Sequence, residues 1–100
     1  MNKKTPQKIE ELILRRKATA DEVLFIFEKI LENWKTIRIY NTIKKTNPNS
    51  KIIKEKVETI STGNCKIFEN ELSPEKYQYY LELREKVYLY HKNKKNIFSN

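Results

Sequence analysis

Residues 34–49, WKTIRIYNTIKKTNPN, contain basic residues and no acidic residue. At 100° per residue, one side of this segment gathers apolar and small side chains, namely Thr36, Ile39, Tyr40 and Ile43. The other side gathers Trp34, Lys35, Arg38, Asn41, Thr42 and Lys45. A strand is the alternative, but the pattern favours an amphipathic helix over residues 34–46, ended by Asn47-Pro48.

The polar side of this helix carries residue types that can recognise duplex DNA. Arg38 can donate to O6 and N7 of guanine, and Asn41 can pair with N6 and N7 of adenine. Thr42 can contact a thymine methyl, while Lys35 and Lys45 can neutralise phosphates. A solvated basic surface without a partner is the alternative interpretation of the same residues.

The charge of the whole chain agrees with a nucleic-acid partner. The net charge is +8 over 100 residues. Residues 1–17, 34–56 and 76–100 are net basic, whereas residues 18–33 and 57–75 are net acidic. We therefore expect one face of the folded domain to be strongly basic, and such a face most often meets nucleic acid.

Two helices are expected before this segment. Thr5-Pro6 predicts a helix start, and the helix would run to Lys17 and bury Ile9, Leu12 and Ile13. The sequence Thr19-Ala20-Asp21-Glu22 is a capping box, which predicts a second helix through Asn33. This second helix is apolar on most sides, so we expect it at the centre of the core.

Residues 50–72 allow two interpretations. Thr62-Gly63-Asn64 holds the single glycine of the chain between runs that contain β-branched residues, which favours a β-hairpin. The alternative is a helix over residues 50–61 with Ile53, Val57 and Ile60 facing inward. We favour the hairpin.

A tyrosine-rich helix follows, starting at Ser73-Pro74-Glu75 and continuing to about Lys92. Two adjacent apolar stripes cover more of its surface than one core contact requires. One stripe contains Tyr77, Leu81, Arg84 and Tyr88. We expect a homodimer interface on the other, formed by Tyr80, Leu83, Val87 and Tyr90. Residues 1–93 would form one domain, and residues 94–100 a basic flexible tail.

The order helix, helix, helix, β-hairpin, helix resembles the winged helix-turn-helix superfamily across residues 5–72, a mainly α fold with a small β-hairpin. The resemblance implies that residues 34–46 lie in the major groove and that the hairpin is the wing. The wing would contact the DNA backbone through Thr62, Gly63, Asn64 and Lys66. Lys3 and Lys4 on an N-terminal arm would add further contacts.

The small size, the richness in Lys, Asn and Ile and the tyrosine-rich helix are similar to accessory DNA-binding proteins of low-GC Gram-positive mobile elements. The transfer-origin-binding proteins of clostridial conjugative plasmids are an example. This resemblance implies sequence-specific binding to short repeated or palindromic DNA sites, in plasmid conjugation or transcription regulation, without catalysis.

Other classes of function find little support. One histidine (His91), one cysteine (Cys65) and one glycine cannot build a familiar catalytic triad, zinc motif or phosphate loop, so we expect no enzyme, metal or cofactor. Without a secretion signal or a long apolar run, we expect a cytoplasmic protein with no membrane partner. A small protein-interaction module or inhibitor, using the basic face or the tyrosine stripe, is the alternative.

Overall fold

The computed structural model describes the backbone of residues 4–99 and the side chains of residues 10–93. Five α-helices follow one another along the chain, with one short 3-10 helix before the last: α1 Lys4–Arg16, α2 Ala20–Leu31, α3 Thr36–Thr46, α4 Lys54–Ile60, the 3-10 helix Glu69–Glu71, and α5 Pro74–Ser99. No β-strand occurs within residues 4–99. Nor does any helix in this range have the length and apolar character that crossing a membrane requires.

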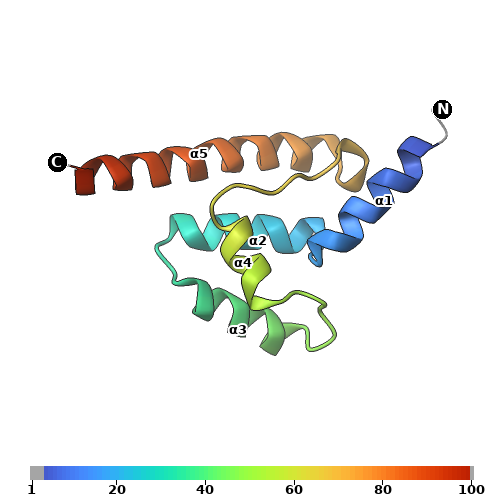
Figure 1. Cartoon of the computed structure of the whole chain (residues 1–100), viewed down its shortest axis with the longest axis horizontal. Coiled ribbons are helices and arrows are strands. Elements are labelled where there is room, and N and C mark those ends of the chain that lie inside the picture. The colour runs from blue at the N-terminus through green and yellow to red at the C-terminus, as the bar shows by residue number, and fades with distance from the viewer. Residues whose placement is uncertain (1–3, 100) are drawn as a thin grey trace.

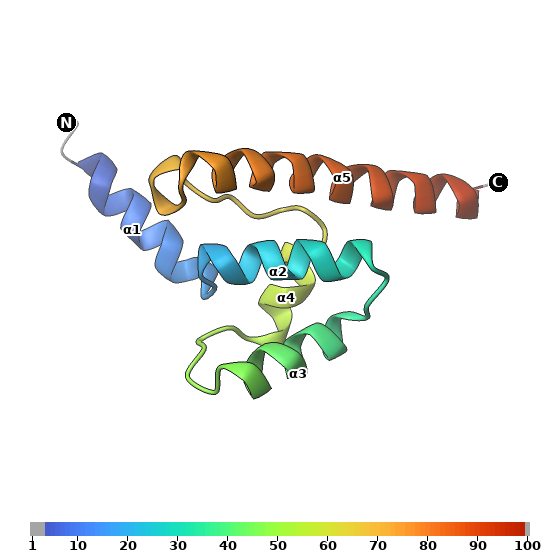
Figure 2. The ribbon, with the colours of Figure 1, turned by 180° about the vertical axis from the view of Figure 1, so that it is seen from behind.

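The helices form layers around α2 (Figure 1). α5 lies along one side of α2 and runs in the same direction, while α3 turns back along the other side. α4 lies across the molecule and leads from α3 toward α5, as the view from behind also shows (Figure 2). α2 is therefore the central element, as its sequence predicts.

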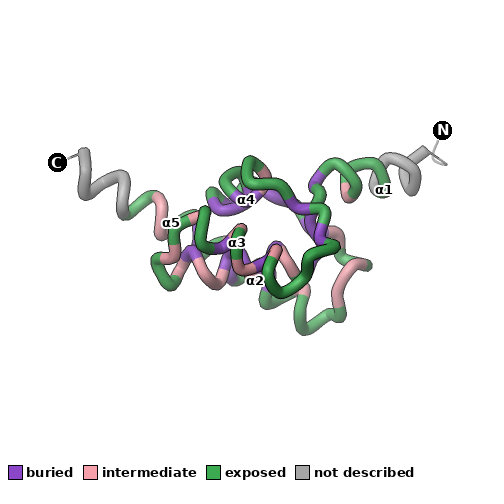
Figure 3. The backbone as a smooth tube through the Cα atoms, turned by 90° about the horizontal axis from the view of Figure 1, so that it is seen from below, coloured by how far each residue is buried: buried purple, intermediate pink, exposed green. Residues whose placement is uncertain are grey.

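The core gathers side chains from α2 to α5 and from the segment before α5. Its fully buried members include Val23, Ile26, Phe27, Ile39, Ile52, Val57, Ile60, Ile67, Tyr80 and Val87. The rings of Phe27 and Tyr80 stack with centroids 6.1 Å apart, which joins α2 to α5. Figure 3 shows buried stretches on all four of these helices, while the described part of α1 is mostly exposed.

The predicted starts of α2 and α5 are confirmed, whereas α1 already begins at Lys4, before the predicted cap Thr5, and α3 begins at Thr36, two residues after Trp34. The Glu22 N–H donates to Thr19 Oγ1 at 3.1 Å, and the Thr19 N–H donates to the Glu22 carboxylate at 2.9 Å, which completes the capping box of α2. α5 begins at Pro74, and the Lys76 N–H donates to Ser73 Oγ at 3.3 Å. α3 is a helix, so the helical interpretation of residues 34–46 is confirmed.

The prediction of a β-hairpin is wrong, and the prediction of a winged helix-turn-helix fold is wrong with it. Residues 54–60 form α4, which is shorter than the helix over residues 50–61 of the alternative interpretation. Its Val57 and Ile60 are buried as that interpretation required, but Ile53 is 39% exposed. Gly63 has a φ of +89° and its N–H donates to Ile60 O at 2.9 Å. The glycine therefore ends a helix in the left-handed conformation instead of forming a hairpin turn.

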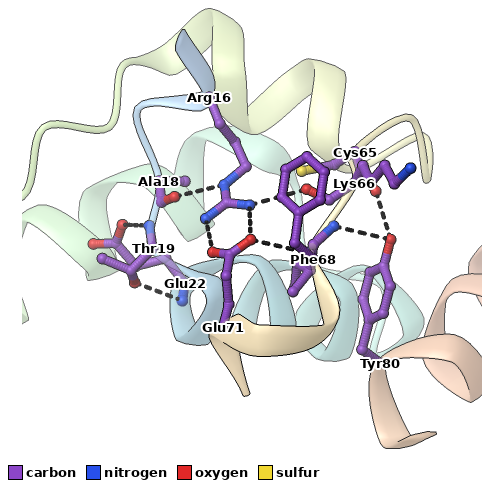
Figure 4. Close-up of polar contacts among 10 residues, drawn as sticks. Arg16, Ala18, Thr19, Glu22, Cys65, Lys66, Phe68, Glu71 and Tyr80 are labelled. Atoms are coloured by element: carbon purple, nitrogen blue, oxygen red, sulfur yellow. Dashed lines mark hydrogen bonds and ion pairs between the residues drawn. The ribbon is translucent and has the colours of Figure 1, made fainter. Parts of the chain in front are cut away.

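Side chains, not a neighbouring strand, hold the extended segment after Gly63 (Figure 4). The Tyr80 hydroxyl donates to Cys65 O at 2.9 Å and accepts the Ile67 N–H at 3.2 Å. Arg16 Nη1 donates to Lys66 O at 2.9 Å, and the Phe68 N–H donates to Glu71 Oε2 at 2.8 Å. These bonds replace those of a β-ladder, because buried backbone groups need partners.

Arg16 and Glu71 form the central ion pair of this network. Arg16 Nη2 lies 2.6 Å from Glu71 Oε1, and the two side chains are only 6% and 13% exposed. Arg16 Nε also donates to Ala18 O at 2.7 Å. Burial alone would raise the pKa of Glu71, but the hydrogen bonds and charge of Arg16, together with the Phe68 N–H, lower it below its ordinary value.

The apolar residues of α1 are mostly uncovered, contrary to our expectation that Leu12 would be buried. Leu12 is 41% exposed and Leu14 68% exposed, while Ile13 is half-buried. Ile9 lies outside the residues with described side chains. α1 leads away from the body of the molecule (Figure 1), so Arg16 is the residue that anchors it.

The stripe of α5 assigned to a dimer packs inside its own chain. Tyr80, Leu83 and Val87 are buried against the core, and the half-buried Tyr90 donates its hydroxyl hydrogen to Asn33 Oδ1 at 2.7 Å. A second molecule therefore has no access to the first three of these side chains. α5 continues to Ser99 and so includes residues 94–99, which we expected to form a flexible tail.

Candidate nucleic-acid interface

One face of α3 turns into the core and the opposite face into solvent. Ile39 and Ile43 are buried, which fixes the rotation of the helix. Arg38, Asn41 and Lys45, spaced three and four residues apart, are all exposed. The structure therefore brings these three predicted residues together on one surface, with the exposed Lys35 at the helix start.

The positive charge of this surface is not neutralised within the described part of the chain. α3 carries no acidic residue, and no ion pair among the described residues involves Lys35, Arg38 or Lys45. Lys44 differs, because it is half-buried and donates to the backbone oxygen of Ser50. The three outward cations are therefore available to an anionic partner.

Trp34 supports Arg38 at the start of α3. The guanidinium carbon of Arg38 lies 3.6 Å from the centroid of the indole ring. The half-buried Trp34 also meets the edge of Phe25, with centroids 6.3 Å apart and planes at 85°. Lys29 of α2 lies 5.0 Å from the same indole centroid. Lys29 is not among the residues predicted from the sequence, and its approach to Trp34 across the turn between α2 and α3 has no local sequence signal.

Thr42 is placed less favourably than the other predicted residues. It is half-buried and lines a cavity of about 280 Å³ between α2 and α3, together with the acidic Asp21 and Glu22. These carboxylates repel phosphate, so Thr42 lies at the edge of the basic surface and not at its centre.

The residues expected in a wing do not join this surface. Gly63 is buried beneath Tyr88 of α5, and Arg84 Nε donates to Gly63 O at 3.3 Å. Thr62 and Asn64 are exposed beside it, and Lys66 is exposed with Nζ 5.3 Å from the Phe68 ring centroid. These residues follow α4 on the side of α5, away from α3 (Figure 1).

The N-terminal arm contributes no described side chain. Lys3 lies outside the described residues, and of Lys4 only the backbone is described, as the first residue of α1. The candidate interface therefore consists of α3 and the end of α2.

Within the residues that the structure describes, no group of three or more His, Cys, Asp or Glu side chains is placed to hold a metal ion. Comparisons with protein-family models, with curated proteins and with solved structures found no match to this chain.

Proposed function

We propose that this protein binds double-stranded DNA through the exposed face of α3, without catalysis. Arg38 and Asn41 would contact base edges, and Lys35 and Lys45 would contact phosphates. The observation that carries the proposal is the uncompensated basic face of a helix whose opposite face is locked into the core. A rigid helix of 11 residues matches the major groove, which admits an α-helix.

A duplex suits this surface better than a single strand. Proteins that bind single strands stack exposed aromatic rings on successive bases. On the α3 side, Tyr40 is half-buried and the indole of Trp34 is covered by Arg38. The exposed tyrosines, Tyr79 and Tyr88, belong to α5 on the other side of α2.

The process that such binding would serve stays a prediction from the sequence. Plasmid transfer and transcription control on a mobile element both use short repeated or palindromic DNA sites, and both occur in the cytoplasm. Two copies would then meet on adjacent sites, because Tyr80, Leu83 and Val87 are buried within each chain.

A binding selection from random duplex DNA at physiological salt tests the proposal. We expect an enriched motif. Arg38→Ala and Asn41→Ala should each weaken binding to it by about 1–3 kcal/mol and leave binding to random DNA nearly unchanged. Gln78→Ala, an exposed position on α5, is the matched control and should change neither affinity.

No retention of duplex DNA would refute the proposal. It would favour the alternative of a protein-interaction module, for which the exposed Leu12 and Leu14 on α1 are the first positions to test. Equal losses on specific and random DNA would instead reassign Arg38 and Asn41 to phosphate contacts.

A further inference from the structure

We infer that Trp34 is a positioning residue that holds the Arg38 guanidinium ready for the edge of a guanine. The inference rests on the proposed function and names the base that its site recognises. It begins from the 3.6 Å contact between the Arg38 guanidinium carbon and the indole centroid, which lies well within the range of a cation–π interaction.

The indole is itself held in place. Trp34 is half-buried, its ring meets Phe25 edge to face, and its backbone N–H donates to Lys29 O at 2.9 Å. The ring is therefore a fixed surface on which the long Arg38 side chain rests. An arginine restrained in this way loses less rotamer freedom on binding than a free one.

The stack leaves the donors of Arg38 available. Contact with an aromatic ring uses the face of the guanidinium, whereas its N–H groups lie in the plane. No hydrogen bond or ion pair among the described residues uses these N–H groups. A planar fork of donors matches the two acceptors O6 and N7 of guanine.

The charge around the ring favours the same base. Lys29 Nζ lies 5.0 Å from the indole centroid but also pairs with the Glu32 carboxylate at 3.4 Å, so Arg38 is the cation on this ring that has no acidic partner among the described residues. In the major groove guanine presents two acceptors, whereas adenine and cytosine present an amino donor that a cation repels, and thymine presents a single acceptor that cannot take both donors of the fork. Asn41, one turn further along α3, would contact the neighbouring base pair.

Guanine contact can be tested by replacing each guanine of the enriched duplex in turn with 7-deazaguanine, which lacks the N7 acceptor. At one position we expect the wild-type protein to lose roughly tenfold in affinity. Arg38→Ala should be insensitive to the same replacement, because the contact is already lost. If the wild type tolerates every replacement, or if Arg38→Ala remains sensitive at that position, the guanine assignment is wrong.

The positioning role is tested with Trp34→Leu, Trp34→Phe and Arg38→Lys. Trp34→Leu should lower affinity for the enriched duplex roughly three- to tenfold and spare a scrambled duplex, while Trp34→Phe should retain most of the affinity. Arg38→Lys keeps the charge at an exposed position but loses the planar fork, so it should behave like Trp34→Leu. Equal losses on both duplexes, or wild-type behaviour of Trp34→Leu and Arg38→Lys, would overturn the inference while the proposed function stands.

Trp34 is the single tryptophan of the chain, so its fluorescence reports on this site alone. Arg38→Ala should change the emission of the free protein, and the enriched duplex should change that of the wild type. An emission unaffected by bound DNA would place the interface elsewhere. A wild type that retains no DNA would overturn the proposed function and this inference together.

Discussion

At the scale of single residues, Arg16 and Glu71 decide how the N-terminal helix joins the body. The guanidinium bonds the Glu71 carboxylate and two backbone oxygens, on Ala18 and Lys66. The end of α1 and the segment before α5 therefore meet at one buried cation. Removing one member of such a pair leaves the other charge buried without its partner, which costs more than the pair itself contributes.

Arg16→Met should destabilise the protein by about 3–5 kcal/mol, as for other broken buried pairs. Lys76→Met is a matched control, because it removes the exposed pair of Lys76 with Asp21, whose atoms are 3.7 Å apart. Exposed pairs contribute about 0–1 kcal/mol, so the control should change little. Urea unfolding measures both, and equal effects would refute the structural role of Arg16.

The same pair makes stability depend on pH in the acid range. The pKa of Glu71 is lower in the folded protein than its ordinary value of 4.5, so the folded state binds fewer protons than the unfolded state. The contribution is therefore present above pH 4.5 and is lost as pH falls through the lowered pKa. Glu71→Gln should flatten the stability–pH curve there, and an unchanged curve would contradict this account.

Cys65 should be protected from alkylation while the protein is folded. Burial raises the pKa of its thiol from 9.0 to about 11, although the charge of Arg16 acts in the opposite direction. The thiolate is the reactive form, so iodoacetamide at pH 8 should react far more slowly with the folded protein than with the urea-unfolded protein. Similar rates would show that the segment after Gly63 opens readily.

At the scale of elements, local signals predicted α1, α2, α3 and α5 but not α4, and they did not specify the partner of each segment. Helix starts are predicted correctly by Thr19 with Glu22 and by Ser73 with Pro74, because the hydrogen bonds that cap these helices join near neighbours in the sequence. Gly63 marks a turn equally well after a helix or a strand. The choice depends on Tyr80 and Arg16, which are distant in the sequence and satisfy the backbone that a second strand would have satisfied.

The residues of the candidate site also divide into those that a local pattern could place and those that depend on the tertiary fold. The periodicity of residues 34–46 was sufficient to place Arg38, Asn41 and Lys45 on one face, because a helix repeats locally. The prediction of a wing was wrong, because its position depended on a tertiary fold that the local pattern could not specify. The approach of Lys29 to Trp34 likewise depends on how the turn between α2 and α3 folds.

Tyr80→Phe tests how the extended segment is held. The change keeps the ring stacked on Phe27 but removes the hydroxyl from Cys65 O and Ile67 N. We expect a loss of about 1–3 kcal/mol in the free energy of unfolding, because two buried backbone groups lose a partner. Tyr79→Phe removes an exposed hydroxyl from Glu28 and is the matched control. A neutral Tyr80→Phe would mean that the segment finds other partners.

At the scale of the whole molecule, charge is distributed unevenly between two sides of α2. The exposed face of α3 carries Arg38 and Lys45 without an acid. α5, across α2, carries exposed residues of both signs, with Lys76, Lys86 and Lys92 among Glu75, Glu82 and Glu85. The exposed face of α3 therefore presents cations without interspersed carboxylates, and we expect a polyanion to approach this face first.

Salt dependence measures how many cations take part. With Lys35 and Lys45 as the phosphate contacts, and with no wing, the logarithm of affinity should fall with the logarithm of salt at a slope of about −2. Lys45→Gln should reduce the magnitude of this slope by about 1, and Lys86→Gln on α5 should leave it unchanged. An effect of Lys86→Gln as large as that of Lys45→Gln would place the DNA on α5.

The position of α5 also has a consequence for how the protein is made. Tyr79 bonds Glu28 across 51 residues, and Tyr80, Leu83 and Val87 close the same side of α2. α5 is synthesised after α2, so the apolar surface of α2 has no cover until the C-terminal part of the chain has left the ribosome. Nascent chains at this stage are natural clients of chaperones, and a product truncated before Pro74 should aggregate or be degraded.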